Sequence, residues 1–319
     1  MLCFDNALLL TRGSPVGLPA LLSHFNPRNG IFTGLARTAG DDLFIGQVKC
    51  VGGRRNARLT FLVPAGTYDS TALLGLLDAL AIEAGQWGAL GVLADVDERA
   101  ELFSVLRRAG YGVYGWQRIY QLPFTGKADY DQPALWRFAA ASDELPIRQL
   151  HQALIPPLVQ VADPLPGGRL YGLVYQVNQQ IRAYVESVYG PEGIYLRPLI
   201  HPDVDNIPQL LVNLENYLSP LLGRKVYLAV RSYQAWLEGL LQDFSPEITA
   251  RQALMVKHLA STQRLTLSNV HRSVVEDTRA EPSAPPMTKK SNQSTASRLN
   301  EPADPKSATG CRMHQNGIQ

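Results

Sequence analysis

The stretch Gly91-Val-Leu-Ala-Asp-Val-Asp-Glu-Arg-Ala-Glu-Leu-Phe-Ser-Val-Leu-Arg-Arg-Ala-Gly-Tyr111 carries the clearest succession of structural signals in the chain. The apolar run Ala89 to Ala94 predicts a strand, and Glu98 to Ala109 predicts an amphipathic helix. Gly110 stands directly after that helix, where a left-handed cap residue is favoured. Tyr111 to Leu122 then predicts extended chain. This order of strand, helix and strand is typical of a mixed α/β fold.

The residues before this stretch extend the pattern toward the N-terminus. They predict a short strand, a helix with Ser14 as its cap, a three-strand meander and a leucine-rich helix. The expected ranges are Asn6 to Thr11, Ser14 to Phe25, Ile31 to Arg37, Leu43 to Val51, Ala57 to Val63 and Ser70 to Glu83.

The second half of the chain predicts the same order of elements. Its expected strands are Leu135 to Ala140, Leu170 to Val177, Ile181 to Val188, Ile194 to Ile200, Val226 to Val230 and Ile248 to His258. Its expected helices are Leu145 to Val161, interrupted near Pro156, then Pro208 to Leu221 and Gln234 to Phe244. An offset of 229 − 94 = 135 relates Ala94 to Ala229 and also Gln117 to Gln252. We therefore predict an internal duplication.

Composition predicts where the two copies begin and end. Phe124 to Pro133 is rich in turn-forming residues and predicts a linker. From Ser261 onward the chain is polar, with few large apolar residues, and predicts a disordered tail. The expected domains are 1–123 and 134–261, with the linker at 124–133 and the tail at 262–319.

The repeated unit resembles the GNAT acyltransferase superfamily. The stretch from Gly91 to Tyr111, continued by Ile119 to Leu122, is similar to the family's fifth strand, fourth helix, glycine cap and terminal strand. Leu59 to Pro64, followed by the helix from Ser70, is similar to its fourth strand and third helix. The resemblance implies two consecutive α/β (α+β) units, each a mixed, largely antiparallel sheet flanked by helices.

The resemblance also implies acetyl-CoA or another acyl-CoA as cofactor, and transfer of the acyl group to an amine. By position alone, the cofactor-binding residues would be Val63, Ala65, Ser70 and Thr71. In the family the pyrophosphate lies on amides at the start of the third helix, where orphan N–H groups attract anions. The family's glycine-rich motif falls on Tyr68, Asp69, Thr71 and Leu73 and is not retained.

The second copy and the catalytic position also depart from the family pattern. The equivalent turn, His201 to Pro208, contains two acids and no glycine. The family's catalytic tyrosine, four positions before the closing glycine, is replaced by Leu106, and its counterpart is Leu241. No catalytic residue is therefore assigned. Asp69 has an alternative role as an ordinary helix cap.

Several polar residues remain as candidates with two interpretations each. Glu186 lies either toward a cleft or on an exposed sheet face, the second being favoured. Asp95 serves either at the carboxyl end of its strand or as a loop cap, and Arg54 and Arg55 are expected to be solvated. His151 and His201 are candidates because a histidine can change its charge near neutral pH. Neither has an evident carboxylate partner in the sequence. The five meander tyrosines line a groove or pack across strands: Tyr171, Tyr175, Tyr184, Tyr189 and Tyr195.

Composition excludes several classes of function. Charged residues make up 18% of the 319 residues and the net charge is +2, so no nucleic-acid or anionic-membrane partner is expected. The three cysteines, Cys3, Cys50 and Cys311, are scattered, which argues against disulfides or a metal site and favours the cytoplasm. No apolar run approaches the ~20 residues that span a bilayer.

Two functions are compatible with these observations. The first is an acyl-CoA-dependent N-acyltransferase, with low or lost activity and a small-molecule or peptide amine as acceptor. The second is a non-catalytic binding or scaffold module of the same fold. The missing phosphate-loop glycines and tyrosine motivate the second, while the resemblance motivates the first. The oligomeric state is not predicted.

Overall fold

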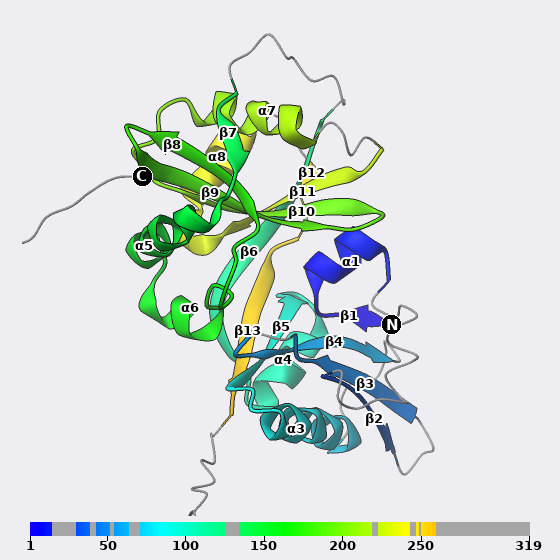
Figure 1. The fold of residues 1–319 in the computed structure, drawn as a ribbon. Helices are drawn as coiled ribbons and strands as arrows, with labels where there is room; N and C mark the ends of the chain where they lie inside the picture. The colour runs from blue at the N-terminus through cyan, green and yellow to red at the C-terminus, as the bar shows by residue number, and fades with distance from the viewer. Residues whose placement is uncertain are drawn as a thin grey trace, which may run out of the picture. The chain divides into compact units, whose positions relative to one another are not determined.

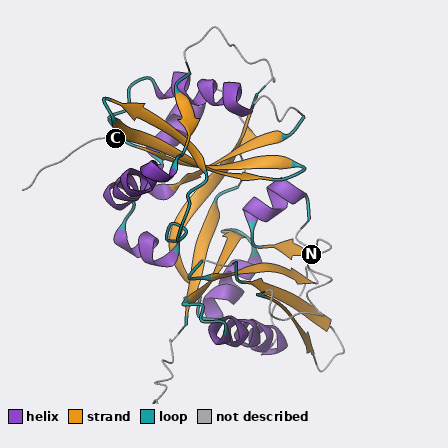
Figure 2. Ribbon diagram, viewed as in Figure 1, coloured by secondary structure: helices purple, strands orange, loops and turns teal. Residues whose placement is uncertain are grey.

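A computed structural model describes residues 1–14, 30–38, 43–51, 54–63, 71–124, 134–218, 223–242, 247–248 and 250–259. These residues form one mixed sheet of thirteen strands, flanked by helices (Figures 1 and 2). The predicted mixed α/β class is confirmed. The predicted tail and the predicted helix Ser14 to Phe25 lie almost entirely outside the described residues, as does most of the predicted linker.

The strands of the first half match the ranges expected from the meander and from the quoted stretch to within a few residues, except that β1 was not predicted. They are β1 Leu2–Cys3, β2 Ile31–Arg37, β3 Leu43–Lys49, β4 Ala57–Val63, β5 Gly91–Asp97 and β6 Gly112–Leu122. The helices are α1 Asn6–Arg12, α3 Thr71–Gln86 and α4 Glu101–Arg108. Gly110, with φ of 86°, adopts the left-handed conformation expected after α4.

The second half follows with β7 Trp136–Phe138, β8 Gly172–Val177, β9 Gln180–Tyr189, β10 Gly193–Ile200, β11 Lys225–Arg231, β12 Glu247–Ile248 and β13 Gln252–His258. Its helices are α5 Glu144–Leu154, α6 Pro157–Ala162, α7 Ile207–Leu218 and α8 Trp236–Gln242, with short 3₁₀ turns at Ala141–Asp143 and Ser232–Gln234. Pro156 separates α5 from α6, as the sequence predicts.

The last strand of each half is exchanged with the other half. The strand order is β2-β3-β4-β5-β13-β6-β11-β10-β9-β8-β7, with β1 added to β4 and β12 added to β6. Strand β13, from the end of the second half, therefore lies between β5 and β6 of the first. Strand β6 in turn pairs with β11 of the second half. The predicted domains 1–123 and 134–261 thus share one continuous sheet.

The prediction of a strand at Asn6 to Thr11 is wrong, because these residues begin helix α1. Asp5 caps the helix by accepting a hydrogen bond from the Leu8 amide at 3.1 Å. Gly13, with φ of 71°, ends it in the left-handed conformation. A short apolar run fits a helix and a strand equally well, so the caps decide the outcome.

Each half has an apolar core to which the exchanged strand of the other half contributes, with Met255 of β13 in the first core and Tyr120 of β6 in the second. The leucines of α3, with Leu73, Leu77 and Leu80 fully buried, pack against β2 and β3. In the second half Leu210, Leu211 and Leu214 of α7 fill the equivalent position. Burial of such side chains stabilises each layer by about 1.5–3 kcal/mol per residue.

Candidate ligand-binding cavity

The candidate site begins where strands β4 and β5 diverge. These parallel strands pair only at Ala57 with Val92 and at Arg58 with Leu93. Beyond that point their facing residues, Thr60 and Asp95, lie at the wall of a cavity. Helix α1 and strand β3 complete this wall in the first half, and β9, β10 and β11 form the opposite wall from the second half.

The cavity has a volume of about 710 Å³, and its charged lining residues are mainly cations. Six basic residues contribute to the lining, namely Arg12, Lys49, Arg54, Arg58, Arg197 and Arg231. Among the described residues, two acids, Asp5 and Asp95, line it with them. Apolar and aromatic side chains, including Leu8, Val188 and Tyr189, line the rest. Such a combination suits a ligand with an anionic group and an apolar body.

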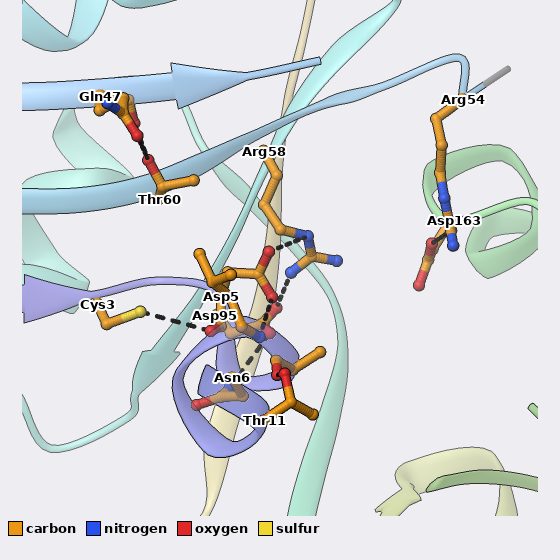
Figure 3. A network of polar contacts seen from close by, with 12 residues as sticks. Cys3, Asp5, Asn6, Thr11, Gln47, Arg54, Arg58, Thr60, Asp95 and Asp163 are labelled. Atoms are coloured by element: carbon orange, nitrogen blue, oxygen red, sulfur yellow. Dashed lines mark hydrogen bonds and ion pairs between the residues drawn. The ribbon is translucent and has the colours of Figure 1, made fainter. Parts of the chain in front are cut away.

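Arg58 is held by acids on two different elements. Its Nη1 lies 3.0 Å from Asp95 Oδ1, and its Nε lies 3.9 Å from Asp5 Oδ2. Figure 3 shows these three side chains pointing toward one another, with Asn6 beside them. Burial raises the pKa of Asp95 and outweighs the Arg58 guanidinium, which lowers it. The pair fixes the head of Arg58 at the floor of the cavity.

Asp163 connects three arginines from different parts of the chain. This carboxylate, at the C-terminal end of α6, accepts hydrogen bonds from Arg197 Nη1 at 3.1 Å and from Arg231 Nη2 at 2.7 Å. Arg54 Nη1 approaches its other oxygen at 4.0 Å. Burial alone would raise the pKa of Asp163, but Arg231 and Arg197 hold it well below its usual range. The side chain is 4% exposed, so the charge is compensated within the protein.

Glu186 completes this cluster and corrects two predictions. It pairs with Arg197 and, at 3.3 Å, with Arg54 Nη2. The Glu186 side chain is 13% exposed, so the favoured interpretation of an exposed sheet-face carboxylate is wrong. The expectation that Arg54 is solvated is also wrong, because Arg54 reaches from the first half to two acids of the second. A hairpin-turn motif cannot show that such acids lie opposite it.

The surroundings of Asp95, His151 and His201 differ in part from those expected from the sequence. Asp95 lies inside β5 and is buried, so neither a strand end nor a loop cap describes it. Burial lowers the pKa of His151 to about 4, and the acids Asp163 and Glu186 only partly oppose this effect. His201 has a carboxylate neighbour after all, since its Nδ1 lies 3.4 Å from Asp203 Oδ2.

The tyrosines of the meander divide between the two interpretations. Tyr189 and Tyr195 line the large cavity. Tyr175 packs on Trp136 with ring centroids 6.1 Å apart, and the Tyr184 hydroxyl donates to the Tyr171 carbonyl at 2.9 Å. Groove lining and cross-strand packing therefore both occur.

One arginine of the cavity has a donor without a partner. Arg231 is 8% exposed, and its Nε makes no hydrogen bond within the described part of the chain. An unsatisfied buried donor costs about 1–3 kcal/mol, more for a charged group. A ligand oxygen reaching this wall would satisfy it.

The residues expected to bind a cofactor by position are divided by the described ranges. Val63 ends β4 and is half-buried, and Thr71 begins α3 and is exposed. Ala65 and Ser70 lie outside the described residues, as does Asp69. Their role in cofactor binding stays a prediction.

Two features of the described residues bear on the binding of an acyl-CoA. In the first half the main chain of Phe4 bridges β4 and β5, donating to the Thr60 carbonyl at 2.9 Å and accepting from the Asp95 amide at 3.0 Å. In the second half Asp203 and Asp205 precede α7, and the side-chain amide of Gln234 donates to Ile200 at the end of β10. Carboxylates at a helix start oppose a pyrophosphate.

Two further classes of site are absent from the described residues. They contain no group of three or more His, Cys, Asp or Glu side chains that could hold a metal ion. None of the helices they form is long and apolar enough to cross a membrane.

Comparisons with known proteins give similarities to solved structures alone. No family model and no curated protein matches the sequence. Among solved structures, the chain is similar to a tandem GNAT protein from the clavulanic acid biosynthesis pathway, with 14% identity, 72% of this chain and 83% of that chain covered, and a TM-score of 0.43. A GCN5-related N-acetyltransferase from Kribbella flavida gives 11% identity, 77% and 98% coverage, and a TM-score of 0.47. A functionally unknown conserved protein from Staphylococcus epidermidis ATCC 12228 gives 10%, 67% and 91%, and 0.47.

The described structure defines a mixed α/β protein, as the sequence predicts. Its two halves exchange their last strands and enclose a cavity whose charged lining residues are mainly cations. At identities of 10–14% these likenesses concern architecture alone, so the activity has to be argued from the cavity.

Proposed function

We propose that this chain is a non-catalytic binding protein of GNAT fold whose cavity holds a small organic acid. The observation that carries the proposal is the excess of six cations over two carboxylates among the described residues that line a 710 Å³ cavity. Small-molecule sites typically have volumes of about 300–1,000 Å³ and few polar groups among apolar ones. A carboxylate would meet the cations, and its organic body would meet the apolar wall.

Lys49 and Arg12 are the cations most available to such a ligand. Neither makes an ion pair with another described residue, whereas Arg58, Arg197 and Arg231 are each shared with acids. Lys49 is half-buried in β3, so its ammonium group is less exposed to solvent than that of a surface lysine. A charge-assisted hydrogen bond there contributes about 1.5–3 kcal/mol.

Acyl transfer from acyl-CoA to an amine is the second candidate, and the fold is its support. The positions of the family's tyrosine hold Leu106 and Leu241, whose hydrocarbon side chains have no ionisable proton to donate; both are fully buried. The gap in the first half is filled by the chain itself. We therefore rank this activity below ligand binding. We retain the cytoplasm as the expected compartment, because Cys3 and Cys50 are free thiols.

The test uses benzoate and its neutral isostere benzamide as probes in calorimetry and thermal unfolding. We expect benzoate to bind and to raise the Tm, and benzamide to do neither. Lys49→Met should weaken benzoate binding about ten-fold, equivalent to about 1.4 kcal/mol. The matched control Lys225→Met, at the exposed start of β11, should leave it unchanged. Equal binding of the two probes would show that the cations do not select the ligand.

Acetyl-CoA serves as the opposing probe. The proposal expects no heat of binding at millimolar acetyl-CoA and no release of CoA thiol with amine acceptors. Tight binding of acetyl-CoA with turnover would replace the binding-protein proposal by the acyltransferase. Mass spectrometry of the native protein would identify an acid that co-purifies with it.

A further inference from the structure

The N-terminal residues form an extra strand inside the gap of the first half. Strand β1 pairs antiparallel with β4 at Leu2 with Leu62 and at Cys3 with Phe61. Phe4 then donates its amide to the Thr60 carbonyl at 2.9 Å. On its other side, the Phe4 carbonyl accepts the Asp95 amide at 3.0 Å. Three residues therefore restore the main-chain hydrogen bonds that β4 and β5 lose where they part.

The side chain of Phe4 anchors this insertion. It is 1% exposed and belongs to the core cluster of the first half, together with Leu59, Leu62 and Leu73. A buried aromatic ring removes a large apolar area from water and therefore contributes strongly to the stability of the core that contains it. The segment is therefore held by pairing along the main chain and by one deep side-chain contact, the arrangement by which sheets bind extended peptides.

Within the described residues, the second half has no equivalent insertion. Its first strand, β7, pairs with β8 at the far edge of the sheet instead of entering the gap beside β10. Strands β10 and β11 also remain paired for longer, over four positions from Gly193 to Leu196. The inserted segment is thus a feature of the first half alone, and the duplication does not explain it.

The residues after Phe4 tie the segment to the second half. Helix α1 ends against the turn between β9 and β10, where the Thr11 carbonyl accepts the Glu192 amide at 2.9 Å. A Cβ atom on Gly190 would lie 2.1 Å from that carbonyl oxygen, so only glycine permits this approach. The insertion is therefore anchored at both ends of a short segment.

We propose that the gap between β4 and β5 is a binding site for a short extended peptide with one aromatic side chain. In the intact chain Leu2 to Phe4 occupies this site. The occupant closes this gap to any other extended ligand. The inference is independent of the acid proposed for the cavity, whose cationic wall lies on other residues.

The experiment removes the occupant and returns it as a separate peptide. A variant lacking residues 2–4 should unfold at a Tm lower by about 10 °C, because it loses a buried ring and its strand pairing. The peptide Met-Leu-Cys-Phe-Asp should bind this variant and restore most of the Tm. The same peptide with alanine in place of phenylalanine should not, and the intact chain should bind neither peptide.

Two results would overturn the proposal. The first is a truncated variant as stable as the parent, and the second is a peptide that binds the intact chain as well as the truncated one. Should the truncated variant fail to fold, hydrogen exchange on the full chain decides. Phe4→Ala should speed exchange of the Asp95 amide at least ten-fold and leave Leu254 in β13 unchanged. Equal Asp95 exchange in parent and variant would exclude an inserted strand.

Benzoate binding separates this proposal from the proposed function. The truncated variant restored by peptide should bind benzoate as the parent does. Loss of benzoate binding in every variant would contradict the acid-binding proposal and leave the peptide result standing.

Discussion

Gln117 of β6 and Gln252 of β13 lie opposite each other, and Gln117 Nε2 donates to Gln252 Oε1 at 3.0 Å. The two residues are 252 − 117 = 135 positions apart, the offset of the sequence repeat. Each residue therefore faces its own counterpart, at the point where the exchanged strands of the two halves meet. The pair marks the centre of the exchange and joins the halves through side chains as well as main chains.

Gln252 also links this centre to the cavity. Asn6 Nδ2 donates to Gln252 Oε1 at 2.8 Å and to Asp95 Oδ2 at 3.2 Å. Replacing Gln252 by alanine leaves Asn6 and Gln117 without this partner, and should lower the free energy of unfolding by about 1–3 kcal/mol. Urea denaturation measures the loss. Gln86→Ala, on the exposed face of α3, is the control and should change it by less than about 0.5 kcal/mol.

Asp163 should be the most sensitive acid in the described part of the chain. Asp163→Asn removes the charge shared by Arg197 and Arg231 and should cost about 3–5 kcal/mol, because it leaves buried guanidinium groups uncompensated. Glu144→Gln breaks only the exposed pair with Arg148 and should cost about 0.5 kcal/mol or less. Equal losses in the two variants would contradict the central role of Asp163.

His151 should make the stability depend on pH in a defined window. Burial holds its pKa at about 4, below the unfolded value of about 6.5, so the unfolded chain binds more protons between these values. The contribution of neutral His151 to the free energy of unfolding is therefore complete above pH 6.5 and is lost as the pH falls toward 4. Asp163, whose pKa is held well below its usual range, and the guanidinium groups of Arg197 and Arg231 stay charged through this window, and Glu186 faces the same cluster.

Denaturation at several pH values would show this slope. His151→Leu should flatten it between pH 6.5 and 4, and the imidazole of the parent should titrate near 4 in NMR spectra. A titration of His151 near 6.5 in the folded protein would contradict the expected burial effect.

Two glycines offer a matched comparison of crowded and open positions. Gly190→Ala places a Cβ atom 2.1 Å from the Thr11 carbonyl oxygen and should destabilise the protein by about 1–3 kcal/mol. A Cβ atom added at Gly75, inside α3, would meet no neighbour within 4 Å, so Gly75→Ala should stabilise the protein by about 0.5–1 kcal/mol. Thermal unfolding of the two variants distinguishes them by the sign of the change in Tm.

The elements of the fold that could be predicted are those with a clear pattern of apolar and turn-forming residues over a few neighbouring positions. Alternating apolar residues predicted β2, β3, β4, β8, β9 and β10 to within a few residues. The turn Asn178-Gln179 has positive φ values of 49° and 67°, as a tight hairpin between β8 and β9 requires. The strand predicted at Asn6 to Thr11 was wrong, because six residues are too few to distinguish the helical period of 3.6 residues from the strand period of two.

The candidate site was much less predictable. Arg54 and Glu186 are 132 positions apart, and Arg231 and Asp163 are 68 apart. Single-sequence patterns contain no signal for such pairs, so they predict a solvated Arg54 and an exposed Glu186 and do not single out Asp163 or Arg231. The positions of two acids and several arginines on opposite halves acquire meaning only when the sheet brings them together.

The sequence by itself determined the mixed α/β class and most of the helices and strands after residue 30, because hydrophobic periodicity and capping residues act over a few positions. Only the tertiary structure decided that β6 and β13 change places, that Leu2 to Phe4 enters the gap between β4 and β5, and that the cations line one cavity. These outcomes depend on which distant segment best satisfies open main-chain groups and buried charges. Packing across the whole sheet decides which segments pair, and short patterns in the sequence contain no information about it.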